Sequence, residues 1–161
     1  MSKSYSVCII GTGYVGLSTG AILAYLGHKV NCVDINQDKI EALKRGEVPF
    51  HEPHMVELLR LARENLHFTT NLEEAIQTTD VGFITVGTPA KADGSTDLSY
   101  ITVAAQAIGK AVRQGQRYLI INKSTVPIGT GHYVKVMAEQ GYQNHHGIKP
   151  ELEQISVASN P

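Results

Sequence analysis

The chain has 161 residues, of which 42% are hydrophobic and 18% are charged, and this suits one globular domain with a substantial core. Its formal net charge is −1 and its 14 lysine and arginine residues are scattered, so the composition argues against a nucleic-acid partner and against binding to a membrane surface. No apolar run approaches the length of a membrane span and the N-terminus shows no signal-peptide pattern, so we expect no membrane segment and a cytoplasmic protein.

In the first half of the sequence, hydrophobic periodicity predicts strands at residues 5–10, 29–34 and 66–69. The same criterion and the capping residues predict helices at residues 14–26, 36–45, 55–64 and 71–78. The first helix carries a stripe that we expect to face the core, formed by Val15, Thr19, Ile22 and Leu26. Gly27 is expected to end this helix.

The second half predicts strands at residues 81–86, 118–121 and 155–158, and helices at residues 98–112 and about 129–140. Residues 141–152 are expected to form a polar connection. His145 and His146 in this connection are expected to be solvated, because the pair lacks the further ligands that a metal site needs.

Strands and helices alternate along the whole chain, with short connections. This order predicts right-handed crossovers, a parallel sheet and helices on both of its faces. The expected fold class is therefore α/β: a doubly wound parallel sheet of the Rossmann type, with about six strands in a single domain. In such a sheet, ligands bind at the carboxyl ends of the strands.

The stretch CIIGTGYVG, residues 8–16, places three glycines between the first predicted strand and the first predicted helix. Gly11 would allow a tight turn, Gly13 would let the backbone approach a pyrophosphate, and Gly16 would let the helix pack close to the sheet. This arrangement is typical of a dinucleotide-binding site. The alternative is that the glycines only form a tight turn between strand and helix.

Asp34 ends the second predicted strand, 18 residues after Gly16. A carboxylate at this position accepts hydrogen bonds from the adenosine ribose and repels a 2′-phosphate, so the position favours NAD over NADP. Lys39 could soften that preference by offering a cation, but a short helix would place it beside the ribose rather than in place of Asp34. The alternative is that Asp34 only caps the segment that follows.

Two further loops at predicted strand ends carry threonines: VGTP, which contains Thr88, and KSTVPIGT, which contains Thr125. Taken alone, each hydroxyl would most simply bond a neighbouring backbone group. Their common position at strand ends, beside a predicted dinucleotide site, favours a functional role.

These motifs also occur in one characteristic order: GTGYVGL, GEVPFHEP, VGTP followed by DGSTDLSYI, KSTVPIGT and the terminal SNP. In this order they resemble the NAD-binding domain of the UDP-glucose 6-dehydrogenase family, which includes GDP-mannose and UDP-N-acetylmannosamine dehydrogenases. The likeness runs from about residue 5 to residue 161. One departure is His54, where the family usually has glycine after Glu52 and Pro53, and this puts the shape of the following helix start in question.

The resemblance implies that residues 1–161 form an NAD-binding domain in which residues 11–16 hold the pyrophosphate and Asp34 and Lys39 hold the adenosine end. Thr125 would lie by the nicotinamide and help to hold a water, which makes it the one catalytic residue expected in this sequence. The cofactor-binding residues implied in this way are Gly11, Thr12, Gly13, Tyr14, Val15, Gly16, Asp34, Lys39, Thr88, Ser124 and Thr125.

The family reaction oxidises C6 of a nucleotide sugar from alcohol to acid, reduces two NAD and passes through a cysteine thioester. The resemblance implies that the nucleophile, the dimerisation region and the UDP-sugar site lie in later domains, and that the complete enzyme is a homo-oligomer. Cys8 and Cys32 fall in predicted strands and are expected to be core residues.

UDP-glucose is the favoured substrate, because DGSTDLSY after VGTP resembles the UDP-glucose and GDP-mannose branches. The sequence stops at SNP, one residue before the family's first glutamate, so we expect a piece of a longer enzyme that is inactive alone. The alternatives are a GDP-mannose or UDP-N-acetylmannosamine dehydrogenase and a stand-alone NAD-binding module with a sensing or partner-binding role. VGTP and KSTVPIGT disfavour a hydroxyacyl-CoA or 6-phosphogluconate type of dehydrogenase.

Overall fold

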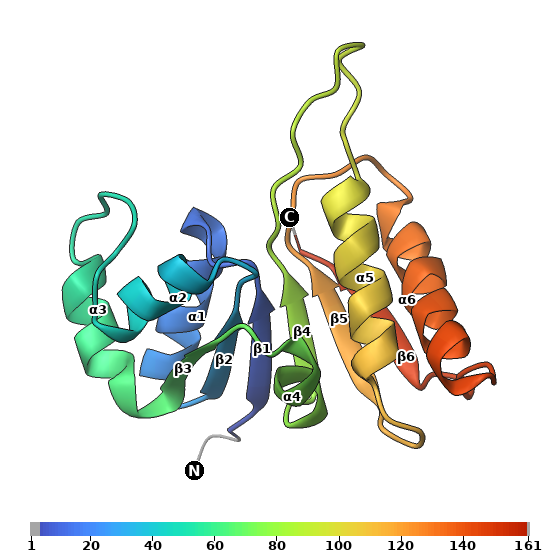
Figure 1. Ribbon diagram of the computed structural model, residues 1–161, viewed down its shortest axis with the longest axis horizontal. Helices are drawn as coiled ribbons and strands as arrows, with labels where there is room; N and C mark the ends of the chain where they lie inside the picture. Colours follow the sequence, from blue (N-terminus) through green and yellow to red (C-terminus); the bar gives the residue numbers. More distant parts are fainter. Residues whose placement is uncertain (1–3, 161) are drawn as a thin grey trace.

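The computed structural model describes residues 4–160 and builds them into one six-stranded sheet with the strand order β3-β2-β1-β4-β5-β6 (Figure 1). All five neighbouring pairs of strands are parallel. The strands are β1 Ser6–Ile10, β2 Lys29–Val33, β3 Leu66–Thr69, β4 Val81–Ile84, β5 Tyr118–Asn122 and β6 Ile155–Ser159. The predicted doubly wound parallel sheet is confirmed. Residues 1–3 and 161 of the predicted domain lie outside the described residues.

The helices cover the two faces of the sheet in two groups. They are α1 Tyr14–Tyr25, α2 Gln37–Lys44, α3 Met55–Ala62, α4 Leu72–Gln77, α5 Ser99–Ala111 and α6 Thr130–His146, with a short 3-10 turn, η1, at Arg63–Asn65. Helices α1, α2 and α3 share one hydrophobic cluster with the sheet, and α4, α5 and α6 share the other (Figure 1). The chain changes face between β1 and β4, which is where a sheet of this type binds its ligand.

The predicted inward face of α1 is wrong. Val15, Ile22 and Leu26 are 45%, 49% and 63% exposed, and the helix instead buries its small residues and Leu17. A Cβ on Gly20 would lie 2.7 Å from the Cys32 sulfur, so the helix lies too close to the sheet for larger side chains on that side. Helix α1 carries apolar residues on all of its sides. The face that is buried is the one whose small residues let the helix pack closely against the sheet, and not the one with the largest side chains.

Helix α6 continues to His146, six residues beyond its predicted end at residue 140. Gly141 lies inside this helix as a contact point: a Cβ there would collide with the Gln106 carbonyl of α5. His145 and His146 therefore lie in the last helical turn and not in a loop. An imidazole nitrogen of His146 lies 2.9 Å from the Val112 carbonyl oxygen, which ties this turn to the end of α5.

Cys8 and Cys32 are both free and fully buried, as predicted. Burial raises the pKa of the Cys32 thiol to about 12, and burial together with the nearby Cys32 raises the pKa of Cys8 as well. Neither thiol is available as a nucleophile at neutral pH. Among residues 4–160, no helix combines the length and the apolar character needed to cross a membrane.

Candidate functional site

The loops that follow β1, β2, β4 and β5 gather at the carboxyl ends of the strands, beside the point where the chain changes face. In Figure 1 this is the upper end of the sheet, where residues 85–98 project beyond the first turn of α5. β4 ends at Ile84, two residues earlier than predicted, so Thr85 and Val86 belong to this loop. The four loops and the first turns of the helices α1 and α2 that follow them contain every residue of the predicted site.

The glycines of the first loop have three distinct geometries. Gly11 has a φ of +99°, which only glycine adopts readily, and a Cβ there would lie 3.0 Å from the Thr85 carbonyl oxygen. A Cβ on Gly16 would collide with the Gly11 carbonyl oxygen. A Cβ on Gly13 would meet nothing within 4 Å. Gly11 and Gly16 therefore serve the fold, whereas the space beside Gly13 is open to a ligand, as the pyrophosphate prediction requires.

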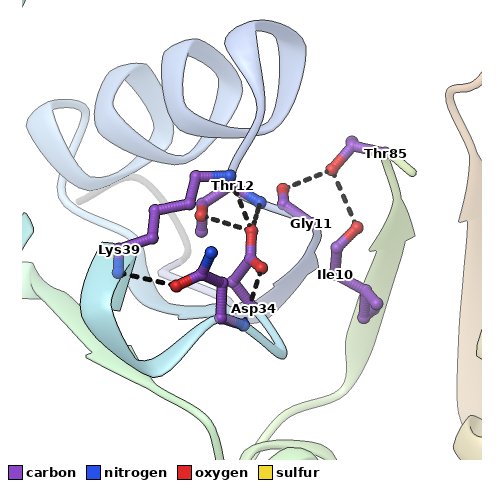
Figure 2. Close-up of polar contacts among 7 residues, drawn as sticks. Ile10, Gly11, Thr12, Asp34, Lys39 and Thr85 are labelled. Atoms are coloured by element: carbon purple, nitrogen blue, oxygen red, sulfur yellow. Dashed lines mark hydrogen bonds and ion pairs between the residues drawn. The ribbon is translucent and has the colours of Figure 1, made fainter. Parts of the chain in front are cut away.

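Asp34, just after β2, is the most heavily bonded side chain of the site (Figure 2). Its Oδ2 accepts hydrogen bonds from the Thr12 backbone N–H at 3.0 Å and the Thr12 hydroxyl at 2.7 Å. The same oxygen pairs with the Lys39 ammonium at 2.8 Å, and Oδ1 accepts from the Asn36 N–H at 3.1 Å. Desolvation opposes ionisation, but these donors outweigh it and lower the pKa of Asp34 from 3.8 to about 2.

The carboxylate is thus ionised at neutral pH and held in one orientation from two loops. With three donors on Oδ2 and one on Oδ1, the oxygen with capacity for a ribose hydroxyl is Oδ1. Thr12 is fully buried and its hydroxyl is directed at Asp34, so it positions the carboxylate. The reading of Asp34 as a simple cap accounts for the Asn36 contact but not for the contacts with Thr12.

Thr85 belongs to the site and sequence reasoning missed it. Its hydroxyl lies 2.9 Å from the Ile10 carbonyl oxygen and 2.8 Å from that of Gly11, so one donor bridges the end of β1 and the start of the glycine loop (Figure 2). The side chain is only 9% exposed. The available signal was a threonine directly after the apolar run of β4, where buried polar groups need a partner.

The two threonine loops are linked to each other. The Ser124 hydroxyl donates to the Val86 carbonyl oxygen at 2.7 Å, and the Thr88 hydroxyl donates to the Thr125 carbonyl oxygen at 3.2 Å. Thr125 itself is exposed, and its hydroxyl has no hydrogen-bond partner within residues 4–160. The structure therefore brings Thr88, Ser124 and Thr125 together, with only the Thr125 hydroxyl uncommitted.

Tyr14 and Val15, in the first turn of α1 directly after Gly13, are 56% and 45% exposed. The Tyr14 ring packs against Phe50 with centroids 5.6 Å apart, and a hydrogen bond with the Glu52 side chain raises the pKa of the tyrosine. The GEVPFHEP loop thus reaches the glycine loop. At its end, His54 has a φ of 66°, the left-handed conformation, and α3 still begins at Met55 as predicted.

Comparison with known proteins agrees with this geometry. Residues 5–161 match the model of the UDP-glucose/GDP-mannose dehydrogenase family, NAD binding domain. The chain belongs to this family. It is 46% identical to the UDP-glucose 6-dehydrogenase of Rhizobium meliloti over 96% of its own length and 34% of the relative's, and 40% identical to that of Pseudomonas aeruginosa over 96% and 33%. The chain thus spans about a third of the length of these curated relatives.

Solved structures give the same result. A UDP-glucose dehydrogenase from Pyrobaculum islandicum is 39% identical, with a TM-score of 0.88 over 99% of this chain and 36% of that chain. A ternary complex of GDP-mannose dehydrogenase from Pseudomonas aeruginosa is 34% identical, with a TM-score of 0.85 over 97% of this chain and 36% of that chain. NAD is the cofactor of this domain family, and the open space at Gly13 and the ionised Asp34 fit it.

Proposed function

We propose that the chain is the cofactor-binding part of a UDP-glucose 6-dehydrogenase, a cytoplasmic homo-oligomer that oxidises UDP-glucose to UDP-glucuronate with two NAD. The observation that carries the proposal is the family match over residues 5–161, together with relatives named UDP-glucose 6-dehydrogenase at about 40% identity. The nucleophilic cysteine and the sugar site would come from domains outside this chain. The two buried cysteines fit that assignment, because neither can reach a substrate.

Within this proposal, the two halves of the site have separate tasks. Residues 11–16, Asp34 and Lys39 serve the adenosine end of NAD, and the loops after β4 and β5 serve the nicotinamide end. Asp34 accepts a hydrogen bond from the adenosine ribose, and the Gly13 backbone leaves room for the pyrophosphate. When bound, NAD accepts the hydride. The Thr125 hydroxyl orients the water that opens the thioester, a role that suits an exposed hydroxyl with no partner within the described chain.

Cofactor preference tests the first task on the chain as it exists. We expect calorimetry to show NAD binding at least tenfold tighter than NADP, because two like charges about 4 Å apart repel by up to about 4 kcal/mol at a surface-like dielectric. Asp34→Ala should narrow this ratio, and Lys39→Gln should widen it, because Lys39 is the cation that could receive a 2′-phosphate. Equal affinities in the wild-type chain would contradict the assignment of Asp34.

The activity requires a second experiment, because the chain alone should not reduce NAD with UDP-glucose. We propose to replace the matching third of the Rhizobium meliloti enzyme with this chain and to measure NADH formation. Turnover with UDP-glucose supports the proposal. A chimera that folds and binds NAD without turnover would favour a stand-alone NAD-binding module. Because the sugar site of this chimera comes from the relative, its turnover tests the NAD-binding domain. UDP-glucose is proposed as the substrate because the relatives that match this chain are UDP-glucose 6-dehydrogenases.

A further inference from the structure

One buried polar side chain has no role in the site as described so far. Asn122 is 1% exposed, and neither its amide nitrogen nor its amide oxygen has a hydrogen-bond partner among residues 4–160. Within residues 4–160 it is the only buried side chain with such unpartnered atoms. Other buried side chains are bonded: Thr79, Thr130 and Gln154 all have partners. An unpaired buried amide lowers stability, so its presence needs an explanation.

The position of Asn122 suggests an explanation for its unpaired amide. It is the last residue of β5, opposite Ile84 of β4 and Ser159 of β6, and it directly precedes residues 123–125 of the threonine loop. Tyr118, Ile120 and Asn122 are buried at alternate positions of the strand, so the carboxamide is on the face covered by α5 and α6. It therefore lies at the carboxyl end of β5, on the same face as α6, and residues 123–129 connect it to that helix.

Of residues 125–129, only Val126 packs against the hydrophobic cluster that α4, α5 and α6 share with the sheet. Pro127, Ile128 and Gly129 are exposed, Ile128 completely. Gly129, the residue at the N-terminus of α6, is in the left-handed conformation, and no side chain caps the helix. Within the turn, the Thr130 N–H and hydroxyl both donate to the Pro127 carbonyl oxygen, and from outside the segment the Thr88 hydroxyl donates to the Thr125 carbonyl oxygen. A small inward movement of residues 125–129 would bring backbone groups toward the carboxamide without breaking the sheet.

We propose that Asn122 is a positioning residue of the cofactor site. When NAD binds, residues 125–129 settle onto the end of β5, and the Asn122 carboxamide hydrogen-bonds their backbone and fixes Thr125 beside the nicotinamide half. The unpaired amide of the free chain is then the cost of a contact made in the bound state. This inference rests on the proposed function, and it assigns Asn122 no contact with the cofactor itself.

The test compares two ligands on the same variants. AMP should need only the glycine loop and Asp34, whereas NAD should also need residues 123–129. Asn122→Leu, which has a similar shape without the amide, should weaken NAD binding about tenfold or more, the equivalent of one or two hydrogen bonds, and leave AMP binding unchanged. The melting temperature of the free variant should rise by a few degrees, because the unpaired amide is gone.

A second pair of variants keeps the test valid if Asn122→Leu does not fold. Asn122→Ser and Asn122→Ala leave similar space, but only serine can hydrogen-bond, so Asn122→Ser should bind NAD several-fold more tightly than Asn122→Ala. Gln154→Leu is the matched control for a buried amide: Gln154 is 2% exposed, bonds the Arg113 carbonyl and lies at the opposite end of the sheet. It should lower the melting temperature and leave the NAD-to-AMP affinity ratio unchanged.

Two results would overturn the role of Asn122: an unchanged NAD affinity in Asn122→Leu, or NAD and AMP affinities that fall together. The second result would mean that the amide supports the sheet as a whole, for example through a buried water. A wild-type chain that binds AMP but not NAD would contradict the proposed function itself. The two failures are therefore distinguishable.

Discussion

The two halves of the candidate site differ in how far the chain satisfies its own polar groups. In the first half, which comprises residues 11–16, Asp34 and Lys39, the carboxylate accepts four hydrogen bonds before any ligand arrives. In the second half, which comprises residues 85–88 and 122–130, the Thr125 hydroxyl has no hydrogen-bond partner within residues 4–160 and both Asn122 amide atoms lack one.

This difference indicates a division of labour. A site that is already bonded binds its ligand with little loss of conformational freedom, so the first half should set the affinity for the adenosine end. Uncommitted polar groups are suited to partners that arrive later, and under the proposed function the first of these is the nicotinamide end of the cofactor.

The largest effect is expected where the first half depends on packing. In Gly16→Ala the new methyl group would collide with the Gly11 carbonyl oxygen and lie 2.5 Å from the Thr85 hydroxyl. We expect a loss of about 3 kcal/mol in stability, or roughly 6–12 °C in melting temperature. Thermal unfolding checks this result.

Gly13→Ala is the matched variant for that loop. Nothing lies within 4 Å of its Cβ position, so the melting temperature should stay within about 2 °C of wild type. NAD binding should nevertheless weaken more than tenfold, because the methyl group occupies the space proposed for the pyrophosphate. Unchanged NAD affinity in Gly13→Ala would place the pyrophosphate elsewhere.

The next effect concerns the charge of Asp34. Its pKa is lowered from 3.8 to about 2 in the folded chain, so the native state binds its proton more weakly than the unfolded state does. The resulting stabilisation is present above about pH 4 and is lost as the pH falls toward 2. After allowing for solvent screening at this partly open site, it amounts to about 1–2 kcal/mol.

The variant Asp34→Asn measures this contribution of the Asp34 charge to stability. Urea unfolding at several pH values should show the variant less stable than wild type at pH 6, with a difference that shrinks steadily below pH 4. Other carboxylates titrate in the same range, but they titrate in both proteins and cancel in the difference. A difference that does not change between pH 6 and pH 3 would mean that Asp34 acts through packing rather than through its charge.

The contrast also explains what the sequence could predict. The parallel sheet, the position of Asp34 and the roles of Gly11 and Gly16 in the fold depend on backbone patterns that short sequence motifs specify directly. The inward face of α1 and the length of α6 depend on close approaches at Gly20 and Gly141, which a period of apolar residues does not record.

Thr85 and Asn122 show a second kind of limit. Each is a polar residue at the end of an apolar strand, and the sequence gives no indication of whether the fold brings a hydrogen-bond partner within reach of its side chain. For Thr85 the partners are the carbonyl oxygens of Ile10 and Gly11, 75 and 74 residues away, and only the folded sheet brings them together. For Asn122 the structure shows burial without a partner, which no local pattern predicts.

A smaller effect is expected at His54, in the loop that reaches the glycine loop through Tyr14 and Phe50. Its φ of 66° is strained for a residue with a Cβ, although histidine tolerates it better than most. His54→Gly should therefore stabilise the chain by about 0.5–1 kcal/mol, or roughly 1–4 °C. His51→Gly, in the same loop but without a positive φ, should not stabilise it. Equal shifts for both variants would contradict the strain.

The smallest effect on the chain itself is expected at Thr125. If its hydroxyl capped α6, Thr125→Ala would lower the melting temperature. The structure contradicts that alternative: Gly129 occupies the cap position without a side-chain bond, and the hydroxyl that bonds in this turn is that of Thr130, 2.7 Å from the Pro127 carbonyl oxygen. Thr125→Ala should change stability by less than about 0.5 kcal/mol, because the residue is exposed and its carbonyl still accepts from Thr88.

Thr130→Val supplies the comparison. It removes a bonded hydroxyl from a side chain that is 4% exposed, and it should cost about 1 kcal/mol or more. In the Rhizobium meliloti chimera the order should reverse. There Thr125→Ala should lower turnover by roughly 10² to 10³, by analogy with the loss of one oriented donor in a transition state. Thr130→Val should retain most of the turnover. The opposite result is that Thr125→Ala lowers the melting temperature as much as Thr130→Val does and leaves turnover intact. That result would show that Thr125 has a structural role and would remove the catalytic assignment from the second half of the site.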